Sequence, residues 1–339
     1  MLMAWVSMIL DSVNFCKNIF HHARFEAWKF KKIFTIWLSI VIYDNIVVMR
    51  YIGCKRLLLK DIEKVIDENI DNAKSFCDIF SGTTIVAQYF KPKYKIISND
   101  LMNFSYCIQK AVIENNFNPK FENLFEKSIQ NPIDFFNNLP ISQMEKLPKC
   151  KRFCQNNYSP RGGRMYVTDE NALRIDYIRN EIENWRKENL IANSEYYYLL
   201  ASLIEAVPYI SNISGTYGAF NKWWDKRALK PLRLKDFDIK NNNHNNLVFN
   251  KEGIQLLLDL SGDILYIDPP YNNRQYPPNY HVLETVAMYD FPELKGVTGQ
   301  RDYTNKKSLF CNKAKARIVF EELIKKAQFK HIILSYSTE

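Results

Sequence analysis

Apolar residues recur along this chain with two different periods, and together these periods predict both helices and strands. Within residues 57–72, Leu58, Ile62, Val65 and Ile66 fall at helical spacing, which predicts an amphipathic helix. Short apolar runs that end at polar or turn residues predict strands, whereas longer stretches predict further helices. The predicted strands are 75–80, 95–98, 247–250, 263–267 and 331–336, and the further helices are 171–186, 196–207 and 313–328.

The order of these elements predicts an α/β protein. Residues 75–98 form a strand–turn–helix–strand unit, which is typical of the first half of a nucleotide-binding parallel sheet. Residues 104–230 read as mainly helical, and an Asn-rich loop then returns the chain to strands. We therefore predict that residues 49–103 and 247–339 form one sheet domain, interrupted by a helical insertion at 104–246.

The two ends of the chain depart from this pattern. The apolar run at 33–43 is 11 residues long, whereas about 20 are needed to cross a bilayer, and its position and flanks do not fit a signal peptide. Since Met49 opens a segment that looks like a natural protein start, we predict that residues 1–48 are an extension outside the domain. The strand at 331–336 runs almost into Glu339, which would leave a buried-type strand as an open edge. We therefore expect an incomplete sheet there and a truncated chain.

Composition and charge add a few constraints. Hydrophobic residues make up 47% and charged residues 24% of the chain, an ordinary globular balance. The net charge of +9 and a pI near 9.0 suit a polyanionic partner such as nucleic acid, although an unrelated basic protein would share them. Seven cysteines and no visible secretory leader favour reduced thiols and a cytoplasmic location. Cys150 and Cys154 have a metal-like spacing but no second Cys or His pair nearby, so we predict no metal site.

One tetrapeptide, Asp268-Pro269-Pro270-Tyr271, carries chemistry of its own and directly follows an apolar strand. Prolines cannot donate backbone hydrogen bonds and have a fixed φ, so the segment ends the strand and holds its carbonyl groups rigidly toward a cleft. Asp268 adds a carboxylate acceptor, and Tyr271 adds a flat stacking face. Together they predict a seat for a planar group with an exocyclic NH2. Once both amino hydrogens are bound, the nitrogen lone pair is free to attack a methyl donor.

The tetrapeptide and its placement resemble motif IV of the D12-class DNA adenine N6-methyltransferases. In that family the Asp carboxylate and a Pro carbonyl hold the adenine amino group while the Tyr stacks on the base, which has to leave the duplex stack to be reached. The resemblance implies a Rossmann-like class I methyltransferase sheet, S-adenosylmethionine as cofactor, double-stranded DNA as partner, no membrane, and a restriction endonuclease that acts separately. It assigns catalysis to Asp268, Pro269, Pro270 and Tyr271.

Further segments resemble other motifs of the family, in the order expected. Residues 78–83 follow a predicted strand and open a helix, like the motif I loop that cradles the methionine part of the cofactor. Residues 51–55 resemble motif X, whose aromatic residue and lysine flank the cofactor. An acid ending the second strand would accept hydrogen bonds from ribose hydroxyls, and an acid 16 residues before Asp268 lies where the family has one near the cofactor adenine. The cofactor-binding candidates are Tyr51, Gly53, Lys55, Asp78, Phe80, Gly82, Asp100 and Glu252.

The helical insertion would hold the target-recognition domain, whose basic residues are suited to contact phosphates or base edges. A solvated basic loop explains any one of these residues equally well. Trp223 and Trp224 stand among basic residues, yet packing into the core would also explain them. The DNA-binding candidates are Arg161, Arg164, Lys222, Arg274 and Tyr276.

Two positions depart from the family pattern. Thr84 stands where the motif I loop usually has a second Gly. A β-branched residue disfavours positive φ and narrows the approach of the backbone to a ligand, so we expect weaker cofactor binding. Glu252 replaces the commoner Asp. Among the alternatives, cytosine N4 methylation is disfavoured because Ser commonly replaces the motif IV Asp in those enzymes. Two alternatives stay open. The substrate could be RNA instead of DNA, and the chain could be a truncated, inactive remnant that still binds DNA.

Overall fold

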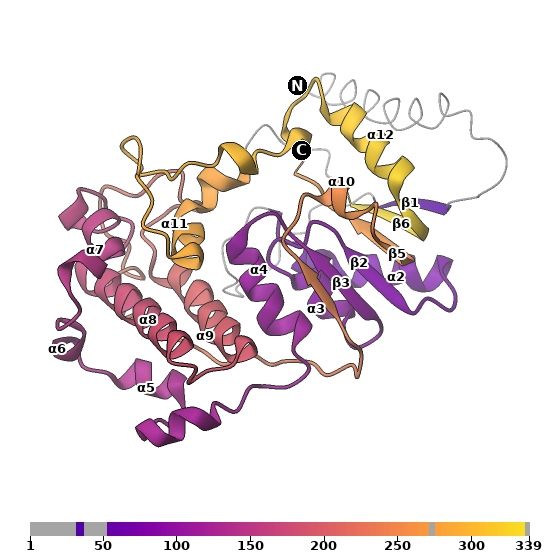
Figure 1. Ribbon diagram of the computed structural model, residues 1–339. Coiled ribbons are helices and arrows are strands. Elements are labelled where there is room, and N and C mark those ends of the chain that lie inside the picture. The colour runs from indigo at the N-terminus through magenta and orange to yellow at the C-terminus, as the bar shows by residue number, and fades with distance from the viewer. Residues whose placement is uncertain (1–31, 37–52, 271–274, 336–339) are drawn as a thin grey trace.

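The computed structural model describes residues 32–36, 53–270 and 275–335, and it shows an α/β protein built on one parallel sheet (Figure 1). The strand order is β1-β6-β5-β2-β3-β4, and every pair of neighbours runs parallel. The five strands predicted from the sequence are confirmed as β2 to β6. The strands are β1 (Lys32–Ile36), β2 (Ser75–Asp78), β3 (Lys95–Asn99), β4 (Leu247–Phe249), β5 (Ser261–Ile267) and β6 (Gln328–Ser335).

The order of strands reverses at β2. From β2 the chain moves to β3 and β4 on one side, and it later returns to β5 and β6 on the other. Asp78 at the end of β2 is in register with Tyr266 of β5, so the carboxyl ends of these two strands lie side by side. Ligands of open parallel sheets bind at such a switch point, because the connections to either side leave a crevice there.

The predicted helices are confirmed as α2, α3, α8, α9 and α12, whereas the sequence pattern does not predict α11. α11 carries Pro277 and Pro278 at its start, where a missing backbone N–H costs little. It is kinked at Tyr280, whose φ of −130° is not helical. The helices are α2 (Leu59–Asn69), α3 (Ile85–Phe90), α4 (Asn103–Gln109), α5 (Pro132–Asn138), α6 (Ile141–Met144), α7 (Phe153–Asn157), α8 (Asp169–Lys187), α9 (Asn193–Ala206), α10 (Gly253–Leu256), α11 (Tyr276–Met288) and α12 (Ala316–Lys326).

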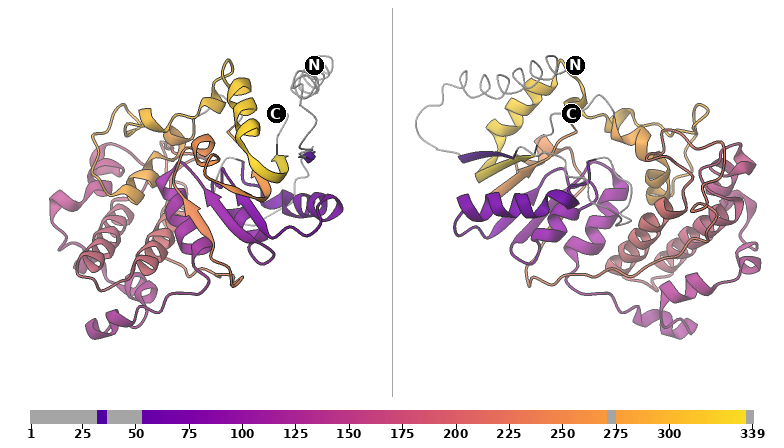
Figure 2. Two further views of the ribbon diagram at one scale, coloured as in Figure 1. Left: turned by 45° about the vertical axis from the view of Figure 1, so that its right-hand side comes forward. Right: turned by 180° about the vertical axis from the view of Figure 1, so that it is seen from behind.

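Alternate side chains of the sheet face two separate cores, as the pleat of a strand requires. Phe76 packs into the larger core, and its neighbour Cys77 packs into the smaller one. Helices α2, α4, α8, α9 and α11 contribute to the larger core, while α10 and α12 cover the opposite face. Figures 1 and 2 show the helical region beside the sheet, and the larger core continues into it. The helical region is therefore packed onto the sheet rather than tethered to it.

The outer neighbour of β6 is β1, which belongs to the N-terminal segment. Lys32 is in register with His331 and Ile36 with Ser335, in a parallel pairing. The expectation that β6 is an open edge is therefore wrong, because residues assigned to an extension outside the domain supply the strand beside it. Within the described residues, β1 is the outermost strand on this side of the sheet.

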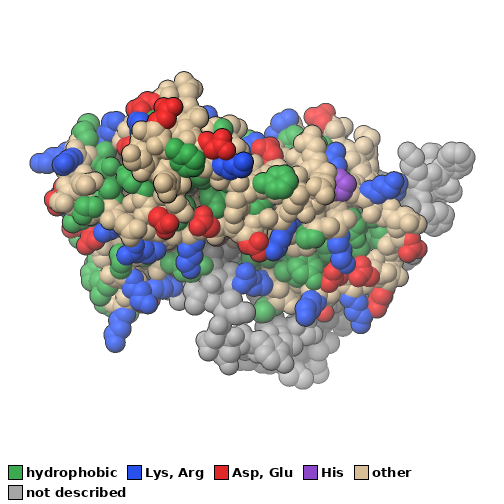
Figure 3. Space-filling view, turned by 90° about the horizontal axis from the view of Figure 1, so that it is seen from below, with side chains coloured by type: hydrophobic (Ala, Val, Ile, Leu, Met, Phe, Trp, Pro, Cys, Tyr) green, Lys and Arg blue, Asp and Glu red, His purple; other side chains and the backbone are tan. Residues whose placement is uncertain are grey.

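The face seen from below in Figure 3 carries Lys and Arg side chains interspersed with Asp and Glu. This face is therefore not the uniformly positive surface that a polyanion would favour. Among the helices of the described residues, none combines the length and the apolar character that crossing a membrane would require.

Candidate active site

Asp268 lies at the point where β5 ends, and Pro269 and Pro270 follow it. Its Oδ2 atom is 2.9 Å from Nζ of Lys55, and both side chains are largely buried. Its Oδ1 atom is buried and has no hydrogen-bond partner among the described residues. Since an unpaired buried acceptor costs free energy, this oxygen is placed to receive a donor from outside the chain.

Asp78, at the carboxyl end of the neighbouring β2, is a second buried carboxyl group. Its Oδ1 atom is also without a partner in the described part of the chain. Burial, together with the nearby charge of Asp268, raises the pKa of Asp78 to about 8. Burial likewise raises the pKa of Asp268 to about 6, although the Lys55 ammonium opposes the rise. The pocket therefore holds two carboxyl groups that would be more stable with a further positive charge between them.

The turn after β2 brings its backbone close to the end of β3. The backbone N–H of Gly82 donates to Oδ2 of Asp100 over 2.8 Å, and the φ of Gly82 is +50°. That conformation suits glycine, which has no Cβ to clash. Burial raises the pKa of Asp100 to about 6, against the hydrogen bonds that it accepts from the backbone of Gly82 and Met102. Asp100 thus fixes the turn as well as facing the pocket.

Thr84 adopts the left-handed conformation that its branched side chain disfavours, with φ at +63°. The side chain is fully buried, and its Oγ1 atom accepts a hydrogen bond of 2.6 Å from Nε2 of Gln88 on α3. Gly82 and Thr83 line the pocket, but Thr84 does not. We expected the Thr84 side chain to narrow the approach to a ligand, but it does not line the pocket. The unfavourable effect of Thr84 is therefore confined to its left-handed backbone conformation.

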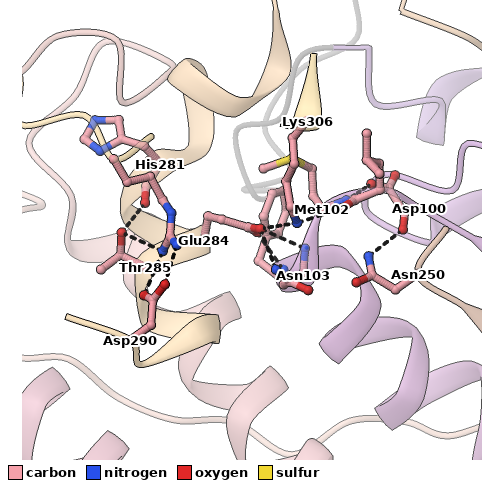
Figure 4. Close-up of polar contacts among 12 residues, drawn as sticks. Asp100, Met102, Asn103, Asn250, His281, Glu284, Thr285, Asp290 and Lys306 are labelled. Carbon is pink, nitrogen blue, oxygen red and sulfur yellow. Dashed lines mark hydrogen bonds and ion pairs between the residues drawn. The ribbon is translucent and has the colours of Figure 1, made fainter. Parts of the chain in front are cut away.

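A polar network holds the segment after β3 in place (Figure 4). The Glu284 carboxylate, on α11 and 2% exposed, accepts hydrogen bonds from the backbone N–H of Asn103 and Phe104, each over 3.1 Å. It also receives Nζ of Lys306 at 2.7 Å, and the same ammonium donates to the carbonyl of Leu101. Glu284 therefore ties the helix that follows the tetrapeptide to the pocket wall next to Asp100.

These groups surround one pocket of about 1110 Å³, counted out to the open solvent. Glu252 lies at its edge as the N-cap of α10, where its side chain accepts the N–H of Gln255 over 3.0 Å. Phe80 and Phe310 form an aromatic wall, edge to face with ring centres 5.3 Å apart. The predicted residues that line this pocket are Gly53, Lys55, Asp78, Phe80, Gly82, Asp100, Glu252, Asp268, Pro270 and Tyr276.

Four further candidates of the motifs and of the segment after them do not line this pocket among the described residues. Tyr51, Tyr271 and Arg274 lie outside the described residues. Pro269 is buried beside the pocket but is not part of its lining. In the described part of the chain, no group of three or more His, Cys, Asp and Glu side chains is arranged to hold a metal ion.

Comparison with known proteins identifies the chain's relatives. A model of the D12 class N6 adenine-specific DNA methyltransferases matches residues 51–338. The chain belongs to this family. The predicted family is confirmed, and the parallel sheet agrees with a Rossmann-like methyltransferase fold.

Several relatives are similar over most of the chain. Type II methyltransferase M.FokI of Planomicrobium okeanokoites is 51% identical over 294 residues, which are 86% of this chain and 45% of that protein. Modification methylase StsI of Streptococcus sanguinis is 46% identical, over 86% of this chain and 44% of that protein. Type II methyltransferase M.NlaIII of Neisseria lactamica is 38% identical, over 86% of this chain and 84% of that protein. The chain spans about half the length of the first two relatives and most of the third.

In this D12-family chain, Arg161, Arg164 and Lys222 lie outside the pocket. Arg161 and Lys222 are exposed. The guanidinium of Arg164 instead donates to the backbone carbonyls of Asn157, Gly296 and Val297, over 3.0 to 3.2 Å. Arg164 thereby joins two loops, a role that leaves little of its hydrogen-bonding capacity for DNA.

Sequence reasoning about this D12-family chain missed Glu284 and Lys306. Glu284 is the one charged residue in the mostly apolar run 282–288. An acid in a run that is apolar enough to be buried needs a partner, and that signal was available from the sequence without knowledge of the helix. The identity of its partners was not, because Asn103 is 181 residues away in the chain.

Proposed function

We propose that the chain is an S-adenosylmethionine-dependent DNA methyltransferase that transfers a methyl group to N6 of adenine in double-stranded DNA. The observation that carries this proposal is the unpaired, buried Oδ1 atom of Asp268, a residue that lines the pocket at the switch point of the sheet. Family membership supports the same reaction. The names of the relatives, which are type II methyltransferases and modification methylases, support a role in restriction-modification. We infer that the chain acts in the cytoplasm, beside a separate restriction endonuclease.

The residues present fit the cofactor. Asp78, Asp100 and Asp268 are three carboxyl groups in one pocket, each with a pKa raised by burial. A ligand that carries positive charge would favour their ionised forms, and S-adenosylmethionine carries both an ammonium and a sulfonium group. When bound, it supplies an electrophilic methyl group. Asp78 and Gly82 would hold its methionine part, Asp100 its ribose and Glu252 the neighbourhood of its adenine.

The target base would be held by the residues after β5. Asp268 would accept one hydrogen of the adenine amino group through Oδ1, and the Pro269 carbonyl would accept the other. Lys55 holds Oδ2 at 2.9 Å, so the carboxylate is oriented before the base arrives. With a pKa of about 6, Asp268 is ionised at neutral pH and is therefore an acceptor on both oxygens. We assign the stacking face to Tyr271.

A base in this pocket has to leave the duplex first, because N6 is inaccessible within the stack. The pocket is lined both by the cofactor candidates Asp78 and Asp100 and by Asp268 of the tetrapeptide. This shared lining supports binding of the base next to the cofactor. Tyr276 and Pro277 of α11 line the same pocket as Asp268, which supports entry of the base along that helix.

The test is to incubate the purified chain with duplex DNA and S-adenosylmethionine labelled in its methyl group, and then to digest the DNA to nucleosides. We expect label in N6-methyldeoxyadenosine and none after Asp268→Ala. Label in N4-methyldeoxycytidine, or in RNA in place of DNA, would assign another substrate. Calorimetry without cofactor binding, together with no incorporation, would identify a remnant that only binds DNA.

A further inference from the structure

The positive charge of the chain is concentrated in two short segments. Residues 146–164 contain six Lys and Arg and no acid, and residues 222–235 contain six more with Asp225 as the one acid. The two segments together have a net charge of +11, which exceeds the +9 of the whole chain. Such a concentration is the electrostatic signature of a surface that meets phosphates.

Both basic segments contact the start of α8, where the Gln155 side chain of the first segment donates to the carbonyl of Asp169 over 3.2 Å. The Asn171 side chain, 2% exposed, donates to the carbonyl of Lys230 over 2.8 Å and accepts the N–H of Leu232 over 2.8 Å. The backbone N–H of Asn212 donates to the carbonyl of Tyr166 over 2.7 Å. These contacts fasten the second segment, and the turn at its start, to α8 and to the residues just before that helix.

That turn, residues 221–225, presents Trp223 to solvent, and the side chain of Trp223 is 74% exposed. The fully buried Asn212 closes the turn with three hydrogen bonds. Its carbonyl accepts the N–H of Asn221, its side-chain nitrogen donates to the carbonyl of Asn221, and its side-chain oxygen accepts the N–H of Asp225, over 2.9 to 3.1 Å. The exposure of Trp223 is thus held by a fixed backbone.

The turn is also connected to the wall of the catalytic pocket. The hydroxyl of Tyr166 donates to the carbonyl of Tyr217 over 2.7 Å, and the N–H of Tyr217 donates to the carbonyl of Asn279 over 2.8 Å. Asn279 lies in the first turn of α11, three residues after Tyr276, which lines the pocket with Asp268. Trp223 is therefore presented by a loop that is built onto the helix beside the base-binding residues.

We propose that Trp223 stacks on a base of the bound DNA where the duplex opens, and that Lys222 and Lys226 bind the flanking phosphates. Flipping a base exposes the faces of its former neighbours, and an aromatic side chain can cover such a face. The indole ring offers a large apolar surface with few rotatable bonds, which suits this task. The exposed ammonium groups of Lys222 and Lys226 lie on either side of it in the sequence. The inference rests on the proposed function, since it requires duplex DNA as the partner.

The test compares Trp223→Ala, Trp223→Phe and Phe117→Ala in the full chain. Phe117 is a matched control, because its side chain is 71% exposed and lies outside both basic segments. We expect Trp223→Ala to raise both the Kd and the KM for unmethylated duplex DNA by about 10- to 100-fold, the range for losing one base–aromatic stack. Trp223→Phe should retain most of the affinity, and Phe117→Ala should retain all of it. Calorimetry should give the same affinity for S-adenosylmethionine in all four proteins.

Two results would overturn the assignment. One is a Trp223→Ala variant that binds DNA like the wild type, and the other is an equal loss of affinity in Phe117→Ala. A change in the melting temperature or cofactor affinity of Trp223→Ala would reveal a folding defect in that variant. The DNA affinity of Trp223→Phe then tests the proposal by itself: affinity near that of the wild type supports it, and the full loss overturns it. DNA binding measured through quenching of tryptophan fluorescence needs no methyl transfer. A chain that binds DNA through Trp223 but methylates nothing would therefore reject the proposed function and keep this inference.

Discussion

β5 carries an aspartate near each end, and the two differ in almost every physical respect. Asp263, near the amino end, accepts hydrogen bonds on Oδ2 from the backbone of Lys74 and Ser75 and from the Ser75 hydroxyl, over 2.9 to 3.1 Å. Its Oδ1 atom lies 2.7 Å from Nζ of Lys330. Asp268, just past the carboxyl end, has one ion pair and one oxygen that no described residue satisfies.

The pKa values follow from these surroundings. Burial works to raise the pKa of Asp263, yet the Lys330 ammonium and the hydrogen bonds from Lys74 and Ser75 lower it to about 2. At the opposite end, burial prevails and raises the pKa of Asp268 to about 6. The amino edge of this sheet is therefore arranged for stability, whereas the carboxyl edge keeps acceptors unpaired for a ligand at the expense of stability.

The largest expected effect separates the two aspartates by activity. Asp268→Asn should lower kcat for methyl transfer by about 10³-fold or more, because an amide offers one acceptor and a donor where two acceptors are needed. Asp263→Asn should leave kcat unchanged. Labelled-methyl incorporation at saturating DNA and cofactor measures both. Equal losses in the two variants would break the comparison.

The next effect concerns Glu284, whose buried ion pair with Lys306 supports the carboxyl edge. Glu284→Gln should lower the free energy of unfolding by about 3 kcal/mol, the lower end for breaking a buried pair. It should also raise the KM for S-adenosylmethionine more than it lowers kcat, since the segment beside Asp100 loses its anchor. A double-mutant cycle with Lys306→Met, followed by urea unfolding, measures the coupling. If the two substitutions lower the free energy of unfolding independently, the ion pair does not hold the segment beside Asp100 in place.

At the amino edge, Asp263→Asn should destabilise the chain by about 2 kcal/mol at pH 7, which corresponds to a pKa lowered from its ordinary value to about 2. The folded-state pKa of Asp263 is depressed, so its contribution is present above about pH 4 and is lost as the pH falls toward 2. Urea unfolding of variant and wild type should therefore differ at pH 7, differ by about half as much near pH 3, and converge only at about pH 2 or below. A difference that does not depend on pH would point to packing instead of charge.

At the carboxyl edge, Asp78 should give the free energy of unfolding the opposite dependence on pH. Its pKa is raised to about 8 in the fold, so its ionisation costs stability. The cost is absent below about pH 4, grows as the pH rises toward 8, and stays constant above it. A cationic ligand favours the ionised form, so cofactor affinity should rise over the same range with release of a proton. Calorimetry in two buffers of different ionisation enthalpy measures that proton, and Asp78→Asn should abolish it.

The smallest effect is expected at Thr84. Thr84→Gly removes a left-handed β-branched residue but also the buried hydroxyl that bonds Gln88. These changes oppose each other, and the net shift in unfolding free energy should stay below about 1 kcal/mol. Affinity for S-adenosylmethionine should not change, because Thr84 does not line the pocket. A tenfold tighter cofactor site would restore the original expectation that Thr84 weakens binding.

The sequence by itself determined the elements and the chemistry at their ends. Apolar runs of β2, β3 and β5 predict buried strands, and Asp78, Asp100 and Asp268 follow from their positions at or just past strand ends. Because parallel strands place their carboxyl ends along one edge, local pattern alone predicts that these three groups meet. The structure brings all three into one pocket.

Only the tertiary structure decided how each group is satisfied. The prolines after Asp268 mark it in the sequence, but nothing local shows that Asp263 is fully paired, since its partners Ser75 and Lys74 lie 188 and 189 residues away. The same holds for Glu284 with Asn103, and for Asn212, which holds the turn that exposes Trp223. Burial and hydrogen bonding are set by what packs around a side chain. Local pattern therefore specifies which groups a segment offers, and packing decides whether they stabilise the fold or stay available to a ligand.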